Sequence, residues 1–230
     1  AGVKCDLCPR KCLVDRKKGE KGICGQTENL KVARAALHFW EEPCISGDAG
    51  SGAVFFSGCP LHCVFCQNEN IANGTVGKEI SLERLVDIFL ELQEKRANNI
   101  NLVTPGHFVP QIVKALDQAR KEGLTLPVVY NTSSYETVDT IKMLEGYVDI
   151  YLPDFKYMSP VLSKKYSHAP DYAEVAKAAI AEMVRQTGKA VFVNGDEDNL
   201  ILSGTIVRHL TLPGCMADSM QILKYLHDTY

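Results

Sequence analysis

Cysteine is the residue type whose spacing first indicates chemistry in this chain. Seven of the nine cysteines fall into two tight groups: Cys5, Cys8, Cys12 and Cys24, then Cys59, Cys63 and Cys66. An odd count in a chain of 230 residues, with no visible signal peptide, argues against a disulfide framework. Clustered cysteines in a reducing compartment indicate metal binding, so we expect two metal sites in a cytoplasmic protein.

The second group lies on one short loop, Cys59-Pro-Leu-His-Cys63-Val-Phe-Cys66. Three thiolates can bind three corners of a [4Fe–4S] cluster and leave the fourth iron without a protein ligand. Such an open position is where a second molecule can chelate. A zinc site is the alternative, but zinc usually takes four ligands, and His62 would have to fold back on its own loop to complete it.

The first group, Cys5-x2-Cys8-x3-Cys12 with Cys24, lies in a segment with too few apolar residues to fold alone. Metal binding would supply the missing stability. Four thiolates suit either a structural zinc ion or a second iron–sulfur cluster, and both remain open. We interpret Cys44 and Cys215 as unligated apolar residues, although Cys44 could replace one N-terminal ligand.

The rest of the chain alternates predicted strands with predicted helices. The strands are expected at 53–57, 99–103, 127–130, 148–152 and 205–212. Ser81 should cap one helix, Pro110 should begin the next, and an Asp171…Glu174 capping pair should open a helix that ends at Gly188. A last helix is expected around residues 220–226. Strands and helices in this order build a parallel sheet with right-handed crossovers.

We therefore predict an α/β fold, a partial (β/α)6-type TIM-like barrel with a small Cys-rich N-terminal extension. Residues 1–30 form the metal-binding extension, residues 31–52 a connecting strand or hairpin, and residues 53–230 the barrel, which stops before an expected sixth strand. In such a fold, chemistry takes place at the carboxyl ends of the strands.

The CxxxCxxC motif after the first barrel strand resembles the signature of the radical S-adenosylmethionine (SAM) superfamily. The strings FFSGCPLHCVFCQN, NLVTPGHFVPQI, YLPDFKY and IVRHLTLPG resemble the branch related to pyruvate formate-lyase activating enzymes, the PflX-type branch. The resemblance implies a [4Fe–4S] cluster on Cys59, Cys63 and Cys66, with SAM chelated to the open iron. It also implies that Phe65 packs on the adenine.

Small polar residues follow two of the predicted strands. In relatives, a Gly-Gly-Glu stretch after the second strand binds the methionyl amine; this chain has TPGH, so the amine would use backbone carbonyls or Thr104. His107 is either part of the site or a plain helix residue. Asn131 and Thr132 end the third strand and could hydrogen-bond to SAM or cap the next helix.

Charged residues lie at the end of the fourth predicted strand and within the fifth. Asp154 and Lys156 alternate along the chain, so both side chains should leave the same face. The resemblance implies that they contact the methionyl part of SAM; a structural ion pair is the alternative. Arg208 and His209 cannot share a face, and we expect Arg208 to point inward, where it could bind the carboxylate.

Composition narrows the function further. The net charge is −3, with 46% apolar and 23% charged residues, and no long apolar run is present, so neither nucleic acid nor a membrane is expected as partner. The resemblance implies reductive cleavage of SAM to a 5′-deoxyadenosyl radical, driven by a flavodoxin or ferredoxin. The substrate would be a glycine of a glycyl-radical enzyme; a small molecule or RNA is the alternative. A non-enzymatic iron–sulfur electron-transfer or metal-binding module is the third hypothesis.

Overall fold

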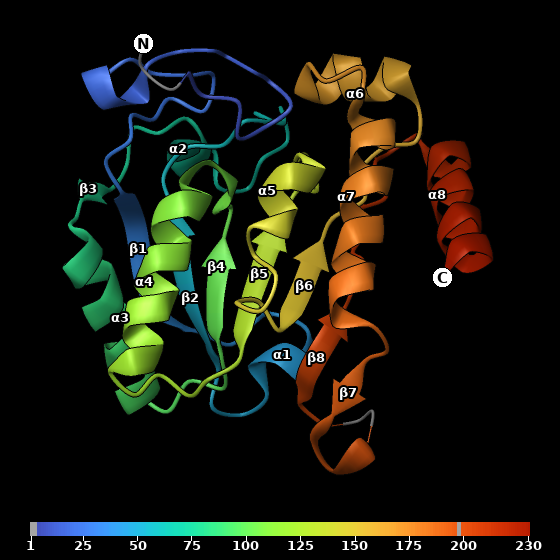
Figure 1. Cartoon of the computed structure of the whole chain (residues 1–230). Helices are drawn as coiled ribbons and strands as arrows, with labels where there is room; N and C mark the ends of the chain where they lie inside the picture. The colour runs from blue at the N-terminus through green and yellow to red at the C-terminus, as the bar shows by residue number, and fades with distance from the viewer. Residues whose placement is uncertain (1–3, 197–198) are drawn as a thin grey trace.

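The computed structural model describes residues 4–196 and 199–230 as an α/β fold around one mostly parallel sheet. The strand order is β3-β1-β2-β4-β5-β6-β8-β7 (Figure 1). The strands are β1 (Lys31–His38), β2 (Ser51–Phe56), β3 (Lys78–Glu79), β4 (Ile100–Val103), β5 (Val128–Thr132), β6 (Ile150–Pro153), β7 (Val191–Phe192) and β8 (Ile201–Thr205). Strands β2, β4, β5, β6 and β8 run parallel, while β1, β3 and β7 are antiparallel to their neighbours.

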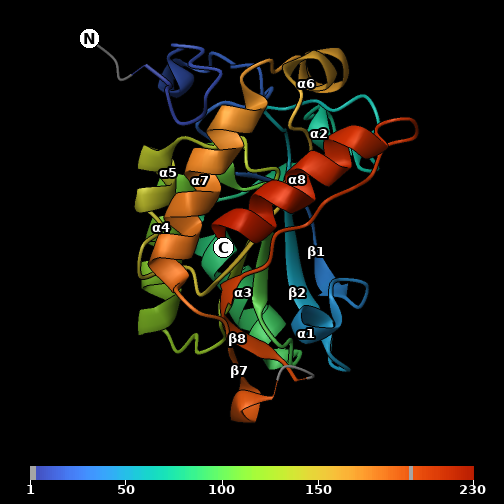
Figure 2. The same ribbon diagram turned by 90° about the vertical axis from the view of Figure 1, so that its right-hand side faces the viewer.

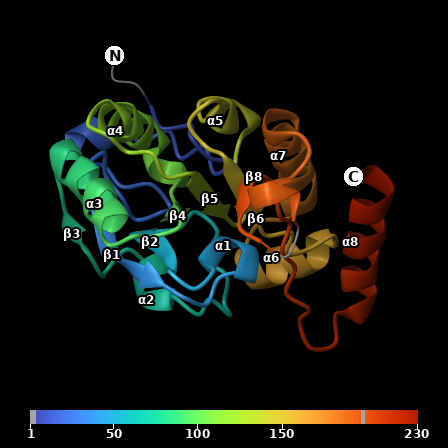
Figure 3. The same cartoon turned by 90° about the horizontal axis from the view of Figure 1, so that it is seen from below.

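Helices cover one face of this sheet. They are α3 (Leu82–Glu94), α4 (Val109–Lys121), α5 (Val138–Lys142) and α7 (Tyr172–Thr187), seen side by side from below in Figure 3. Ser81 accepts a hydrogen bond from the Arg84 amide at the start of α3, as the sequence predicts. Asp171 does precede α7, but its carboxylate accepts a bond from the Tyr135 hydroxyl and makes no cap, so the expected capping pair is wrong.

The other face is partly filled by the segment between β1 and β2. Strand β1 pairs antiparallel with β2, and Ala36 lies opposite Ala53. Between the two strands the chain forms the short helix α1 (Pro43–Ser46), which packs on this face. Ile45 of α1 is fully buried against apolar residues of β5, β6 and β8. The segment at 31–52 thus adds strand β1, between β3 and β2, to the sheet and an apolar plug, Ile45, to the face opposite the long helices.

The remaining helices are α2 (Glu69–Ala72), α6 (Pro160–Ser167) and α8 (Met216–Thr229), and the 3-10 turns are η1 (Arg16–Lys18), η2 (Gly106–Phe108) and η3 (Val193–Gly195). Helix α8 crosses beside α7, away from the sheet (Figure 2). No helix in the described residues is long and apolar enough to cross a bilayer.

The last predicted strand, at 205–212, is wrong in position. Strand β8 begins at Ile201 and ends at Thr205, and beyond it only an isolated bridge joins Arg208 to Asp154. The apolar residues Val207 and Leu212 that suggested a strand pack instead into a second core with α7 and α8, and this pulls the chain away from the sheet. The short antiparallel strand β7 was not expected.

The inner plug gives a test of stability. Ile45→Ala should lower the free energy of unfolding by about 3 kcal/mol, because it removes a fully buried side chain and leaves a cavity. Urea denaturation followed by circular dichroism measures the loss. Ile23→Ala removes the same atoms from a side chain that is 51% exposed and should change little; equal losses in the two variants would contradict a packed plug.

Candidate functional site

The three-cysteine loop follows β2 and brings its thiols into one electrostatic environment. Burial raises the pKa of Cys59 to about 11, and the neighbouring Cys63 and Cys66 thiols act in the same direction. The Cys59 sulfur accepts a hydrogen bond from the Leu61 amide at 3.4 Å. Burial also raises the pKa of Cys63, against the opposing influence of the Lys156 cation. With raised pKa values, the Cys59 and Cys63 thiols need a metal or a nearby positive charge to ionise at neutral pH.

The donor set, three thiols on one loop, suits three irons of a [4Fe–4S] cluster. Among residues 4–196 and 199–230, no three His, Cys, Asp or Glu side chains converge where one metal ion could be held. In a [4Fe–4S] cluster each thiolate binds a different iron, so its ligands need not converge on one atom. Ser167 donates a hydroxyl hydrogen bond to the Cys63 sulfur at 3.0 Å, the kind of contact that stabilises cluster thiolates. His62 turns away from its loop toward the Ile23 carbonyl.

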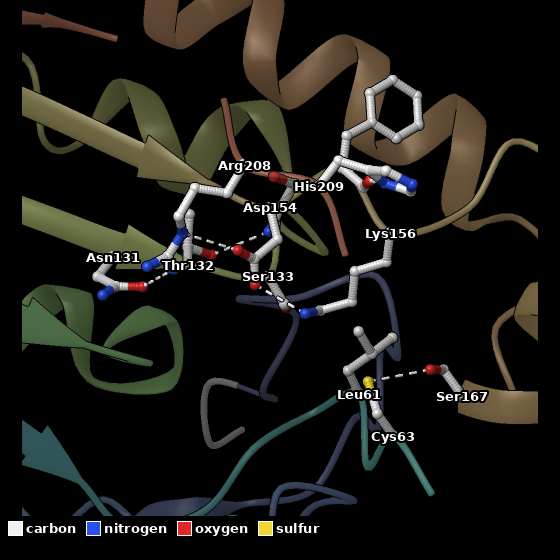
Figure 4. Close-up of polar contacts among 12 residues, drawn as sticks. Leu61, Cys63, Asn131, Thr132, Ser133, Asp154, Lys156, Ser167, Arg208 and His209 are labelled. Atoms are coloured by element: carbon white, nitrogen blue, oxygen red, sulfur yellow. Dashed lines mark hydrogen bonds and ion pairs between the residues drawn. The ribbon is translucent and has the colours of Figure 1, made fainter. Parts of the chain in front are cut away.

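Asp154 is the centre of a charged network at the ends of β5 and β6 (Figure 4). One carboxylate oxygen accepts a bond from Lys156 Nζ at 2.7 Å, and the other accepts from Arg208 Nε at 2.9 Å. Arg208 Nη2 donates to Asn131 Oδ1 at 2.6 Å. Burial acts to lower the pKa of Lys156, but the charges of Asp154 and Cys63 outweigh it, so the pKa is raised and the ammonium stays charged.

The prediction that Asp154 and Lys156 share a face agrees with this geometry, and so does the choice of Arg208 over its neighbour. Arg208 points at Asp154, whereas both ring nitrogens of His209 are engaged elsewhere, with the Phe155 carbonyl and the Ser219 hydroxyl at 2.7 Å each. Lys156 also lies close enough to Cys63 for each charge to act on the other. The network therefore joins the strand ends to the cysteine loop.

Two polar residues of this network were missed by sequence reasoning. Glu41, from the segment before α1, accepts a bond from Arg208 Nη1 at 3.2 Å and is only 9% exposed. Burial raises its pKa, and Arg208 acts against the rise. Asn101 of β4 is fully buried beside Glu41, where its side-chain amide acts to lower the pKa of that carboxyl, and its side-chain oxygen has no hydrogen-bond partner. The only signal was the pair Glu41-Glu42 before Pro43, which nothing in the sequence connects to distant strand ends.

Thr132 is not brought to the network. It leaves β5 on the face opposite Asn131, and its hydroxyl donates to the buried carboxylate of Glu136 at 2.8 Å. Thr104 follows β4 with a φ of 53°, a left-handed conformation that is rare for a β-branched residue. Such backbone outliers gather at functional sites, so Thr104 stays a prediction with a local observation behind it.

The two rings singled out in the sequence differ in their surroundings. Phe65 lies half-buried between Tyr157 and Tyr166, with ring centroids 6.3 Å from each. The packing of Phe65, within the cysteine loop, on the adenine of SAM remains a prediction. His107 is buried and donates from Nε2 to the Ser57 carbonyl at 2.7 Å, while burial lowers its pKa to about 4. It acts as a neutral core residue that ties η2 to the end of β2.

The N-terminal cysteines also lie near one another. Burial raises the pKa of Cys8 to about 12 and also raises that of Cys24, and the Cys12 thiol acts on both. The Ile23 amide donates to the Cys12 sulfur at 3.3 Å. Cys44, on α1, lies at the opposite end of the sheet from this segment, so it is not placed to replace one of its ligands (Figure 1). The second metal remains a prediction.

Comparison with known proteins decides the family. The model of the radical SAM superfamily matches residues 53–198, more than half of the chain. This protein belongs to the radical SAM superfamily. The match covers Cys59, Cys63 and Cys66, and membership of the superfamily implies a [4Fe–4S] cluster and SAM. This domain supports an enzyme of the radical SAM class.

One relative extends the comparison. An uncharacterized protein of Methanocaldococcus jannaschii is 28% identical over 215 residues, which cover 91% of this chain. The chain spans only 57% of the length of that relative.

Glu136 makes the stability depend on pH. It is 5% exposed and burial raises its pKa to about 7, although Thr132 and Tyr130 donate hydrogen bonds to it. Ionisation in the folded state is therefore penalised. Above the unfolded pKa of about 4.3, the free energy of unfolding should fall as pH rises to about 7, by roughly 3 kcal/mol in all.

Urea denaturation at pH 5 and pH 8 measures this slope, and Glu136→Gln should flatten it. The exposed Glu94→Gln is the matched control and should keep the wild-type slope. A Glu136→Gln variant with an unchanged pH dependence would show that the carboxyl is ionised throughout.

Proposed function

We propose that this protein binds a [4Fe–4S] cluster on Cys59, Cys63 and Cys66, binds SAM beside it, and starts radical chemistry on a separate substrate. The observation that carries the proposal is the position of the Asp154 network. Lys156, one partner of Asp154, also acts electrostatically on Cys63, so the charged strand ends adjoin the proposed cluster loop. A molecule with both an amine and a carboxylate suits a site that offers both signs of charge.

A [4Fe–4S] cluster held by Cys59, Cys63 and Cys66 would supply the one electron that cleaves SAM reductively to methionine and a 5′-deoxyadenosyl radical, the species that would abstract hydrogen from the substrate. The side chains of the Asp154 network bind SAM and orient it. Arg208 and Lys156 offer donors to the carboxylate, while Asp154 offers an acceptor to the amine. Asn131 and Glu41 hold Arg208 in place, so the guanidinium needs little reorganisation when SAM binds.

For the substrate we propose a glycine in a partner protein, with a flavodoxin or ferredoxin as reductant and the cytoplasm as location. The resemblance of four strings to the PflX-type branch of activating enzymes supports this assignment. The parallel strands β2, β4, β5, β6 and β8 would form the arc of a partial barrel, with the N-terminal cysteines holding a second metal. A small molecule or RNA in place of the glycine leaves the cleavage chemistry unchanged.

The test is anaerobic reconstitution with iron and sulfide, followed by dithionite and SAM. Wild-type protein should release 5′-deoxyadenosine and methionine, measured by liquid chromatography. Cys63→Ala should lose the cluster absorbance and reduce 5′-deoxyadenosine by at least about a thousandfold, since a cluster ligand is gone.

Cys215→Ala is the matched control, because that thiol is half-buried and outside both cysteine groups. It should keep wild-type iron content and product formation. A wild-type protein that binds iron but forms no 5′-deoxyadenosine would favour the electron-transfer module over the enzyme.

Asp154→Asn should weaken SAM binding by at least about tenfold, or about 1.4 kcal/mol. The change removes a charge that compensates Lys156 and Arg208, so the half-buried Lys156 loses its carboxylate partner and Arg208 keeps only those of Glu41 and Glu42. Isothermal titration of reconstituted, unreduced protein measures the affinity. Asp117→Asn breaks an exposed ion pair of the same 2.7 Å length and should bind SAM like wild type. Equal affinity in the two variants would remove Asp154 from the site.

A further inference from the structure

The N-terminal segment lies across the carboxyl ends of the strands, over the region of the three-cysteine loop (Figure 1). Arg10, between Cys8 and Cys12, is its main contact with that region. The Arg10 guanidinium donates from Nε to the Pro60 carbonyl at 2.8 Å, from Nη2 to the Ser167 carbonyl at 2.9 Å and from Nη1 to the His168 carbonyl at 2.6 Å. Its plane also lies over the Tyr135 ring, 5.1 Å from the centroid.

These carbonyls belong to two structures that hold the cysteines. Pro60 directly follows Cys59, so one bond of Arg10 fixes the start of the loop. Ser167 is the last residue of α6, and its hydroxyl donates to the Cys63 sulfur. The neighbouring Tyr166 carbonyl accepts a bond from the Val64 amide at 2.9 Å. Arg10 therefore joins the loop to the helix end that holds the middle of the same loop.

The chemistry of the contact requires an arginine. The carbonyls of Ser167 and His168 lie at the C-terminal end of α6, where backbone oxygens lack helical partners and a positive charge is favourable. A planar guanidinium can donate to three oxygens in different directions, whereas a lysine ammonium on a flexible stem cannot reproduce that geometry. The stacking on Tyr135 orients the plane and adds a cation–π contribution.

A second tie runs in the opposite direction. His62, within the cysteine loop, has a φ of 51°, and its Nε2 donates to the Ile23 carbonyl at 2.8 Å. A left-handed conformation costs free energy for a residue with a side chain. Here the His62 ring is directed to the Ile23 carbonyl. The N-terminal segment and the loop are thus bonded to each other from both sides.

We propose that Arg10 is a positioning residue for the Cys59–Cys66 loop, and that the N-terminal segment is thereby part of the cluster site. The guanidinium holds the loop against the end of α6 in the arrangement that presents the three thiols together. Only the statement that this loop carries a cluster rests on the proposed function.

Amide hydrogen exchange of the full chain tests the contact without any cofactor. The Val64 and Cys66 amides are bonded to the carbonyls of Tyr166 and Cys63, so their exchange reports on the loop. Arg10→Gln and Arg10→Lys should both speed their exchange by at least about tenfold. After anaerobic reconstitution, both variants should also show an altered electron paramagnetic resonance spectrum of the reduced cluster, which a merely stabilising residue would not change.

Two control variants separate this role from general stability. Lys11→Gln removes an exposed charge from the next position and should behave like wild type. Arg16→Gln removes an arginine that anchors the same segment to the carbonyls of Thr27 and His107 and that, within residues 4–196 and 199–230, makes no side-chain hydrogen bond to the loop. It should lower the melting temperature and leave Val64 and Cys66 exchange within about twofold of wild type.

The outcomes distinguish the two proposals. Unchanged exchange of Val64 and Cys66 in Arg10→Gln, or equal acceleration in Arg16→Gln, would overturn the role of Arg10. Because exchange is measured without iron or SAM, that result does not depend on whether wild-type protein cleaves SAM. If Arg10→Gln accelerates the exchange but wild-type protein forms no 5′-deoxyadenosine, the role of Arg10 stands and the enzymatic proposal is contradicted.

Discussion

The half-buried carboxylate of Asp154, shared between Lys156 and Arg208, is the contact on which the site depends. Charges removed from water are tolerated only when they are paired and their remaining hydrogen-bonding groups are satisfied. Each cation here comes from a different part of the chain: Lys156 lies two residues beyond Asp154, while Arg208 follows β8. Because both cations pair with this one carboxylate, the ends of β8 and of its neighbour β6 meet in a single polar centre.

The inner face of the sheet extends this network. Glu41 reaches Arg208 from the segment that also places Ile45 in the apolar plug, so one short stretch supplies both the floor of the face and an acidic partner for its guanidinium. Asn101, buried beside Glu41 with its side-chain oxygen unpaired, is an exception to the rule that buried amides are fully satisfied. An unsatisfied amide facing a charged network is typical of a surface whose remaining partner is a ligand or water.

The cysteine loop is held from outside in a comparable way. Its Leu61 side chain is fully buried in the second core, and Cys59, Cys63 and Phe65 pack against the same cluster. Its backbone includes the left-handed His62. Arg10 and Ser167 add hydrogen bonds to its backbone and sulfur atoms. The N-terminal segment, with little core of its own, is tied to the loop through Arg10 and His62, so the two segments stabilise each other over the strand ends.

The sequence by itself determined the α/β class, most strand and helix positions and the three-cysteine loop, because hydrophobic period, caps and ligand spacing are local properties. Alternation also placed Asp154 and Lys156 on one face. Local pattern failed at 205–212, where Val207 and Leu212 serve a second core rather than the sheet, and at Thr132, whose face could be judged only with β5 in its register. Glu41, Asn101 and Arg10 were decided by the tertiary structure alone. Their partners lie 50 or more residues away or in another layer, and no spacing along the chain encodes which distant carbonyl or carboxylate a side chain will meet once the elements have packed.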